Sequence, residues 1–124
     1  KLNKLKSAIE YYNKSIALNK NYPYSFLNKS VIYIEQGKIK KAIQVLTEGI
    51  EYNPYAEYLY YNRACCHAKL NENDKAIMDL RKVIVLSPEF IETMKVDEDL
   101  KNLYNDERFI EIISRYKKNN LKEK

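Results

Sequence analysis

Residues 37–54 read GKIKKAIQVLTEGIEYNP, and residues 71–88, one period of 34 residues later, read NENDKAIMDLRKVIVLSP. Both segments begin with a residue type that tolerates the left-handed backbone conformation, and both end in an X-Pro pair, which disfavours continuation of a helix. Between these ends lie an Ala-Ile pair and other residues in a helical stripe at i, i+4, i+7 and i+8. Each segment therefore predicts one amphipathic helix with a turn on either side.

The 34-residue period extends over most of the chain. Repeats of 20 to 50 residues are typical of stacked arrays, in which one unit alone cannot bury its apolar face. Five sets of residues spaced 34 apart, called columns below, show the period: Ala8, Ala42 and Ala76; Ile9, Ile43 and Ile77; Ile16, Ile50 and Ile84; Tyr12, Leu46 and Leu80; Asn3, Gly37 and Asn71. The last column marks the turn just before each of these amphipathic helices. The expected helices span about 4–19, 23–36, 39–52, 56–70, 73–86 and 88–95, with a helical turn near 98–104 and a last helix near 107–118.

The composition supports long helices joined by short turns. The chain has 124 residues, of which 45% are hydrophobic and 31% are charged, which fits one compact domain. Only two glycines and three prolines are present, too few for a fold rich in tight hairpins. A phosphate-binding loop or a dinucleotide fingerprint needs closely spaced glycines, whereas Gly37 and Gly49 are far apart. A nucleotide-dependent enzyme is therefore disfavoured.

The net charge of +5 does not form a nucleic-acid footprint. Residues 1–6 and 115–124 together carry +7, so the middle of the chain, residues 7–114, carries −2. A basic surface that follows phosphates should lie along the folded domain, with base-reading side chains beside it. We therefore expect no nucleic-acid partner.

The sequence shows no membrane-spanning or targeting segment. No apolar run reaches the roughly 18 to 20 residues that a membrane-spanning helix needs, and residues 1–6 contain no signal-peptide core. Cys65 and Cys66 are adjacent and point about 100° apart on a helix, so they build no disulfide framework. We expect no membrane partner and a cytoplasmic location, and an upstream signal or anchor would leave no trace in this sequence.

Two successive units resemble the tetratricopeptide repeat in their period, alanine, turn and proline positions. The residues that carry the resemblance are Phe26, Tyr33, Gly37, Ala42, Ile43 and Pro54 in one unit, and Asn71, Ala76, Ile77, Leu80, Leu86 and Pro88 in the next. The resemblance implies an all-α fold, a right-handed α-solenoid of antiparallel helical hairpins. The expected units are a partial repeat with only its second helix at 1–22, complete repeats at 23–56 and 57–90, and a degenerate repeat with a basic tail at 91–124.

The last helix differs from the repeat pattern. Phe109, Ile112, Ile113 and Tyr116 lie at i, i+3, i+4 and i+7, which predicts an apolar face that covers the open end of the last hairpin. We expect a C-terminal capping helix.

The resemblance also implies that the first helix of each unit lines a concave groove, which binds an extended peptide or a helix of a partner protein. The residues expected to face it are Tyr24, Leu27, Asn28, Val31, Ile34, Tyr58, Tyr61, Asn62, Cys65 and Lys69. The side-chain amides of Asn28 and Asn62, one unit apart, could pair with the backbone of a bound peptide. Alternatively, both asparagines hydrogen-bond locally and the tyrosines pack between hairpins.

One branch of the family binds the carboxylate tails of heat-shock chaperones with two lysines, two asparagines and an arginine. Asn62-Arg63-Ala64 resembles one part of that clamp. However, Leu27 and Val31 stand where the clamp needs a lysine and an asparagine. A chaperone tail is therefore disfavoured as the ligand.

No motif predicts catalysis or metal binding. Cys65, Cys66 and His67 are adjacent on one helix and cannot surround a zinc ion by themselves. The acidic run 97–99 lacks the ligand spacing and the glycine of a calcium loop. His67, the only histidine, has no nucleophile beside it that the sequence reveals. We expect no catalytic residue, no metal and no cofactor.

These observations predict a noncatalytic protein-protein interaction scaffold whose peptide or protein ligand is not encoded in the sequence. An alternative is self-association, or a structural spacer role, through the uncovered face of the first expected helix. That face bears Ala8, Tyr12 and Ser15, and exposed apolar stripes recruit partners. The expected oligomeric state is a monomer or a weak homodimer.

Overall fold

The computed structural model describes the backbone of residues 2–123 and the side chains of residues 3–115. Every regular element in this range is helical, which confirms the predicted all-α class. The predicted helix over 88–95 is divided into a 3₁₀ turn and one α-helical turn. The elements are α1 (Leu2–Leu18), α2 (Pro23–Glu35), α3 (Ile39–Tyr52), α4 (Glu57–Lys69), α5 (Asn73–Leu86), η1 (Pro88–Phe90), α6 (Ile91–Met94), η2 (Glu98–Leu103) and α7 (Glu107–Glu123).

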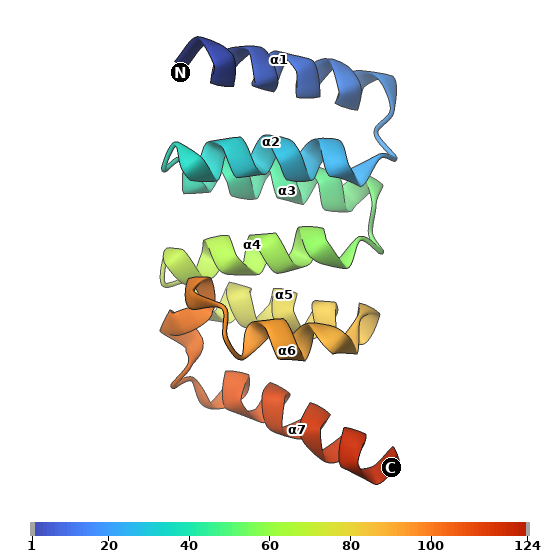
Figure 1. Ribbon diagram of the computed structural model, residues 1–124, viewed down its shortest axis with the longest axis vertical. Coiled ribbons are helices and arrows are strands. Elements are labelled where there is room, and N and C mark those ends of the chain that lie inside the picture. Colours follow the sequence, from blue (N-terminus) through green and yellow to red (C-terminus); the bar gives the residue numbers. More distant parts are fainter. Residues whose placement is uncertain (1, 124) are drawn as a thin grey trace.

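The helices stack side by side along the long axis of the molecule, with the two termini at opposite ends (Figure 1). Helices α2 and α3 pack as one antiparallel hairpin and α4 and α5 as the next, while α1 packs against α2 and α3 against α4. In the view of Figure 1, α2 lies in front of α3 and α6 lies in front of α5. The surface formed by α2 and α4 is called the first-helix face below.

Left-handed residues reverse the chain inside each hairpin. Gly37 has φ +76° and Asn71 has φ +59°, as the turn column predicts. Each lies two residues after one helix ends and two residues before the next begins. Asn3 was expected to mark the same turn, but it lies inside α1, so that prediction is wrong. A left-handed residue is needed only where the chain must reverse, as it does at the other two positions.

The buried side chains within residues 3–115 form two clusters, one on either side of α4. The first cluster joins α1, α2, α3 and α4, and its fully buried members include Phe26, Ala42 and Leu46. The second joins α4, α5 and the C-terminal segments, and it includes Ala76 and Leu80. Ala42 and Ala76 of the alanine column are therefore buried at the contacts between paired helices, whereas Ala8 is half-buried.

Gly49 allows α3 to approach its neighbours closely. A Cβ atom at this position would lie 2.8 Å from both Cβ and Cγ of Phe26 and 3.2 Å from Cδ1 of Leu59. Both of these side chains are fully buried, so neither can swing into solvent. The absent side chain is thus a packing requirement at the junction of α2, α3 and α4.

Helix α7 covers the end of the stack, as predicted. Phe109 is buried, and Ile112 and Ile113 pack partly buried against the second cluster. Arg108 donates a hydrogen bond from Nη1 to Oδ1 of Asp74 at 2.7 Å, which ties α7 to the start of α5. The side chain of Tyr116, the fourth member of the predicted face, lies outside the described side chains.

We predict that Gly49→Ala destabilises the chain by about 1–3 kcal/mol, because the added methyl group overpacks Phe26. An exposed glycine inside a helix would show the opposite sign, since alanine is the better helix former by about 1 kcal/mol. Urea unfolding followed by circular dichroism measures the effect, and the exposed neighbour Glu48→Ala is the control. A raised midpoint for Gly49→Ala would contradict the close packing.

Candidate functional site

One face of α2 carries uncharged side chains that remain open to solvent. Tyr24, Asn28 and Val31 are spaced i, i+4 and i+7, so they share one side of the helix, and all three are exposed. The exposed fraction of Tyr24 is 47%. Pro23 sets the start of this helix, because its fixed φ suits the first helical position. Leu27 and Ile34, also expected in the groove, are half-buried and pack against the first cluster.

Three tyrosines extend this face from α2 to α4. The rings of Tyr24 and Tyr58 stack with centroids 5.0 Å apart and an interplanar angle of 12°. Tyr22 lies against Tyr24 at 5.6 Å. Burial, and next the neighbouring Tyr24, raise the pKa of the Tyr58 hydroxyl to about 12. The Tyr58 hydroxyl is thus an uncharged hydrogen-bonding group at neutral pH.

The two asparagines differ in their hydrogen bonding. Asn62 donates from Nδ2 to the carbonyl oxygen of Tyr58 at 2.8 Å, one turn back on its own helix. Asn28 is exposed, and within the described part of the chain its side chain forms no hydrogen bond. Asn62 therefore hydrogen-bonds within its own helix, as the alternative interpretation of the two asparagines expects. The amide of Asn28 is available to a ligand.

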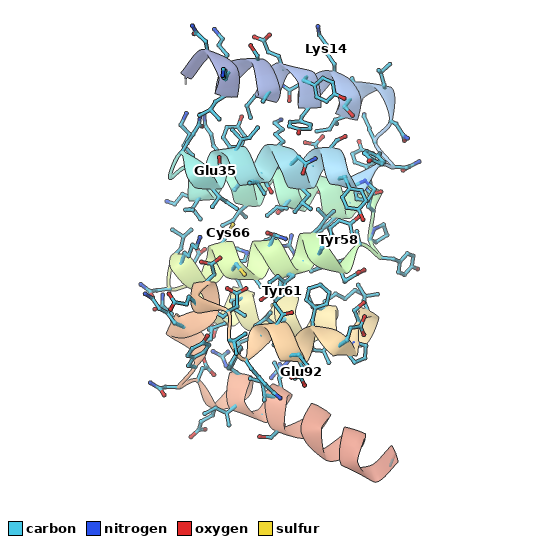
Figure 2. All side chains as sticks on the ribbon, in the orientation of Figure 1. Lys14, Glu35, Tyr58, Tyr61, Cys66 and Glu92 are labelled. Carbon is cyan, nitrogen blue, oxygen red and sulfur yellow. The ribbon has the colours of Figure 1, made fainter. Side chains whose placement is uncertain are left out.

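The chain's own C-terminal segment covers α4 at Tyr61 and Cys65. Tyr61 (labelled in Figure 2), expected to line the groove, is only 7% exposed. Its ring packs on Phe90 with centroids 5.0 Å apart. Cys65, expected beside it, is also 7% exposed. Lys69 remains exposed but forms an ion pair with Asp99 at 3.4 Å. Tyr61 and Cys65 are therefore buried, contrary to the expectation of an open groove, because η2 packs against α4 at this point.

Asp97 fixes the covering segment in place. Its Oδ2 accepts a hydrogen bond from the Tyr61 hydroxyl at 2.5 Å, and its Oδ1 accepts one from the backbone N–H of Asp99 at 3.0 Å. Its carbonyl oxygen accepts a third from the hydroxyl of Tyr104 at 2.7 Å. Burial and the bond to Asp97 raise the pKa of Tyr61 above its ordinary value. The Tyr61 hydroxyl is therefore protonated at neutral pH and donates to Asp97.

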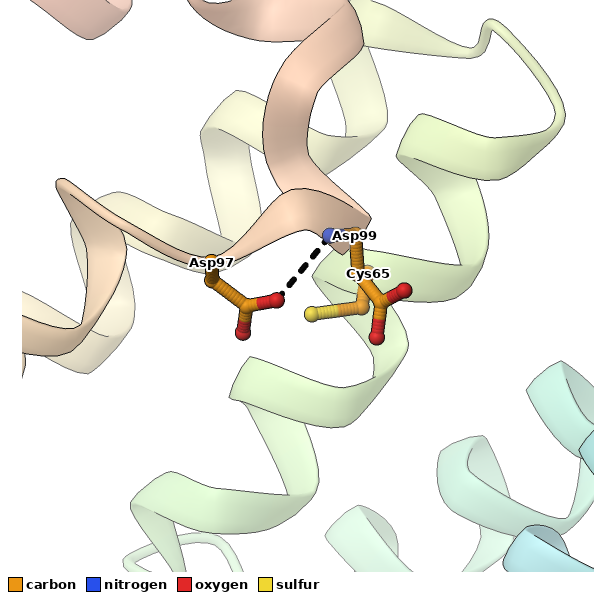
Figure 3. Close-up of side chains that lie close together, drawn as sticks. All are labelled: Cys65, Asp97 and Asp99. Atoms are coloured by element: carbon orange, nitrogen blue, oxygen red, sulfur yellow. Dashed lines mark hydrogen bonds between the residues drawn. The ribbon is translucent and has the colours of Figure 1, made fainter.

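The same contact brings together three groups that the sequence treats separately. Cys65 comes from α4, whereas Asp97 and Asp99 come from the turn into η2 (Figure 3). Burial, followed by Asp97 and Asp99, raises the pKa of the Cys65 thiol. The adjacent Cys66 points into the first cluster, and burial raises its pKa to about 11. The sequence offered no spacing rule for this cluster, since its members are far apart along the chain.

Arg63 is committed to a structural ion pair. Its Nε and Nη2 donate to the two carboxylate oxygens of Asp79 at 2.8 and 2.7 Å, and its Nη1 donates to the hydroxyl of Thr47 at 3.1 Å. This bidentate pair joins the two helices of the second hairpin. His67 lies next to the pair, with Nδ1 3.0 Å from Oε1 of Glu72, and this hydrogen bond lowers the pKa of Glu72. The guanidinium group is thus unavailable to clamp a ligand carboxylate.

We predict that Tyr61→Phe loosens the C-terminal segment. The variant removes the hydrogen bond to the half-buried carboxylate of Asp97, at a cost of about 1–3 kcal/mol. Hydrogen exchange of the amides of residues 97–104 should become faster, whereas exchange in α2 and α3 stays the same. The control is Tyr58→Phe, which removes the equivalent hydroxyl group near the start of α4, away from residues 97–104. Unchanged exchange at residues 97–104 would mean that this bond does not hold the segment.

No helix in the described part of the chain is long and apolar enough to cross a membrane. A comparison with curated proteins finds no match. Among solved structures, the crystal structure of MamA is similar over 95% of this chain and 67% of the MamA chain, with a TM-score of 0.71 and 22% identity. A second crystal structure of MamA protein matches over 92% of this chain and 61% of its own, with a TM-score of 0.69 and 22% identity. These likenesses show the helical-repeat fold.

Two family models, both described as Tetratricopeptide repeat, match residues 11–44 and 58–90. The two matches start at different points of the 34-residue period, so the unit boundaries expected at 23, 57 and 91 stay a prediction. Repeats of this family typically serve as noncatalytic protein-interaction modules, which supports a general interaction role. The chain belongs to the tetratricopeptide repeat family.

Proposed function

We propose that the chain is an interaction scaffold that binds an extended peptide segment of a partner protein on the open half of the first-helix face. The residues proposed to contact the peptide are Tyr22, Tyr24, Asn28, Val31 and Tyr58, with Leu27, Ile34, Asn62 and Lys69 at the edges of the site. The single observation that carries the proposal is the stack of exposed Tyr24 on half-buried Tyr58 between α2 and α4. Tyr61 and Cys65 are not part of this surface, because they are buried.

The chemistry of this surface suits an extended peptide. Tyrosine rings provide a large contact area at a low cost in side-chain entropy, and their hydroxyls hydrogen-bond to a peptide backbone. Asn28 lies one helical turn from Tyr24 and can both donate to and accept from one peptide group. Val31 continues the same side of the helix with an apolar contact. Together they combine apolar anchors with backbone recognition, as extended-peptide sites do.

We predict that Tyr24→Ala weakens peptide binding at least tenfold, which corresponds to about 1.4 kcal/mol, because an interface tyrosine is a common hot spot. Random 12-residue peptides displayed on phage are selected on the immobilised chain, and the selected sequences are synthesised with a fluorescent label. Fluorescence anisotropy then gives the Kd for wild type, Tyr24→Ala and Asn28→Ala. The thermal midpoint should change little, since both side chains are exposed.

Met78→Ser is the matched control for this experiment. Met78 is also an exposed apolar side chain, but it lies on α5, outside the first-helix face. Peptides that bind wild type and Met78→Ser equally, and Tyr24→Ala weakly, support the proposal. Equal binding by all variants would place the peptide elsewhere, and selection that yields no binding peptide would remove the proposed function.

Self-association is the second candidate, because the outer side of α1 exposes apolar residues. Tyr11 is 67% exposed, whereas Val45, one period later, is 7% exposed where α3 packs against α2. Leu18 is 88% exposed. The stripe expected to be open is instead partly covered, since Ser15 hydrogen-bonds Ser25 of α2 through their hydroxyls at 2.6 Å. The candidate contact therefore centres on Tyr11 and Leu18.

We predict that, if this face mediates self-association, size-exclusion chromatography with light scattering shows a dimer at tens of micromolar. The double variant Tyr11→Lys/Leu18→Lys should then be a monomer, because two charges would enter an apolar contact. Met78→Lys on α5 is the control and should leave the dimer intact. A wild-type monomer over the whole concentration range would eliminate this second candidate.

A further inference from the structure

The contact between α4 and η2 creates a cluster of three groups that can ligate a metal. Cys65 provides one sulfur atom, and Asp97 and Asp99 each provide a carboxylate oxygen. These three atoms lie within 4.8 Å of one another (Figure 3). The cluster mixes one soft ligand with two hard ligands and draws them from two separate elements.

Cys65 belongs to the second cluster, and its thiol lies where that cluster meets two carboxylates. Its side chain is buried, and its Sγ points toward the carboxylate of Asp97, as Figure 3 shows. The same sulfur lies within 4.8 Å of a carboxylate oxygen of Asp99. Within the described residues the thiol forms no hydrogen bond. A buried cysteine often behaves as a small apolar side chain, as Cys66 does in the first cluster. Cys65 packs in the second cluster, but its buried thiol also borders two carboxylates and has no hydrogen-bond partner among the described residues.

The ligand atoms are already oriented by their neighbours. The hydroxyl of Tyr61 and the backbone N–H of Asp99 hold the two oxygens of Asp97, at 2.5 and 3.0 Å. Hydrogen bonds of this kind to ligating carboxylates are usual around protein metal sites, where they fix the direction of the remaining lone pairs. The cation already present in the cluster is the ammonium group of Lys69, 3.4 Å from Asp99. Its side chain is exposed enough to move away.

We propose that Cys65, Asp97 and Asp99 bind a divalent transition-metal ion of the Zn²⁺ class. One thiolate and two carboxylates supply three ligands, and water completes a tetrahedral shell. The thiol proton passes to solvent when the metal binds, so the Cys65 sulfur enters as a thiolate. Calcium and magnesium do not fit, because both prefer shells made of oxygen alone.

The geometry needs only a small adjustment. Zinc–ligand bonds of about 2.0–2.3 Å place ligand atoms roughly 3.5 Å apart, so the widest separation of up to 4.8 Å must close by about 1 Å. Asp99 is exposed and can make this movement by rotating its side chain. Release of Lys69 accompanies it, since ammonium and metal compete for the same carboxylate.

The test is a titration of the reduced 124-residue chain with Co²⁺, followed by displacement with Zn²⁺. Thiolate-to-cobalt charge transfer absorbs in the near ultraviolet, so the readout reports the sulfur ligand directly. We expect one equivalent of Co²⁺ to bind wild type, Zn²⁺ to remove the band, and an equal concentration of Ca²⁺ to leave it unchanged. Cys66→Ala, the adjacent buried thiol, is the matched control and should keep the band.

The variants separate the proposed site from other cation binding. Cys65→Ser should abolish the charge-transfer band, Asp99→Asn should weaken Co²⁺ binding at least tenfold, and Lys69→Ala should strengthen it several-fold. Asp99 is exposed, so Asp99→Asn decides the question even where Cys65→Ser fails to fold. The proposal is overturned if wild type shows no band, if Cys66→Ala loses the band, if Asp99→Asn binds as wild type does, or if Ca²⁺ displaces the cobalt.

Discussion

The packing of α4 on two sides at once is the constraint on which the rest of the chain depends. Leu59 and Cys66 face the first cluster, whereas Ala64 and Ala68 face the second. Eight of its thirteen residues are buried, so most of the helix is in contact with other elements. Neither hairpin can bury its apolar residues without the other, because α4 completes both clusters. This is the physical form of a repeat array, in which stability comes from contacts between neighbouring units.

The same constraint divides the first-helix face into an open half and a covered half. On the side toward α2, Tyr24 and Val31 remain exposed, because α4 covers only part of α2. Toward the C-terminus, η2 packs directly on α4 and buries Tyr61 and Cys65. The open half supports the proposed peptide site, and the covered half brings Cys65 beside the two carboxylates. Both proposals thus depend on where α4 meets its neighbours.

Local and periodic features of the fold could be predicted from the sequence. The second helices, the left-handed turns at Gly37 and Asn71, and the capping face of α7 follow from residue type and spacing within one or two turns. The 34-residue period then places equivalent helices side by side. The prediction for Asn3 was wrong because the 34-residue period shows only that a similar residue recurs at this position. It does not show whether the chain reverses there.

Features that depend on departures from the period could not be predicted. After Pro88 the segment no longer repeats the earlier helices, so nothing in the sequence indicated that Asp97 would lie against Tyr61. The bidentate pair of Arg63 with Asp79 was equally hidden, because both residues also suit an exposed position. The tyrosine stack at Tyr24 and Tyr58 followed the period and was therefore found among the predicted groove residues.

The most direct test of this account compares two tyrosines on the same face. Hydroxyl-radical footprinting with mass spectrometry measures how fast each side chain is oxidised in the native chain. The account predicts that Tyr24, in the open half, is modified several-fold faster than Tyr61, and that the difference disappears when the chain is unfolded in urea. Equal rates for Tyr24 and Tyr61 in the native chain would show that the C-terminal segment does not cover α4, and would contradict the account.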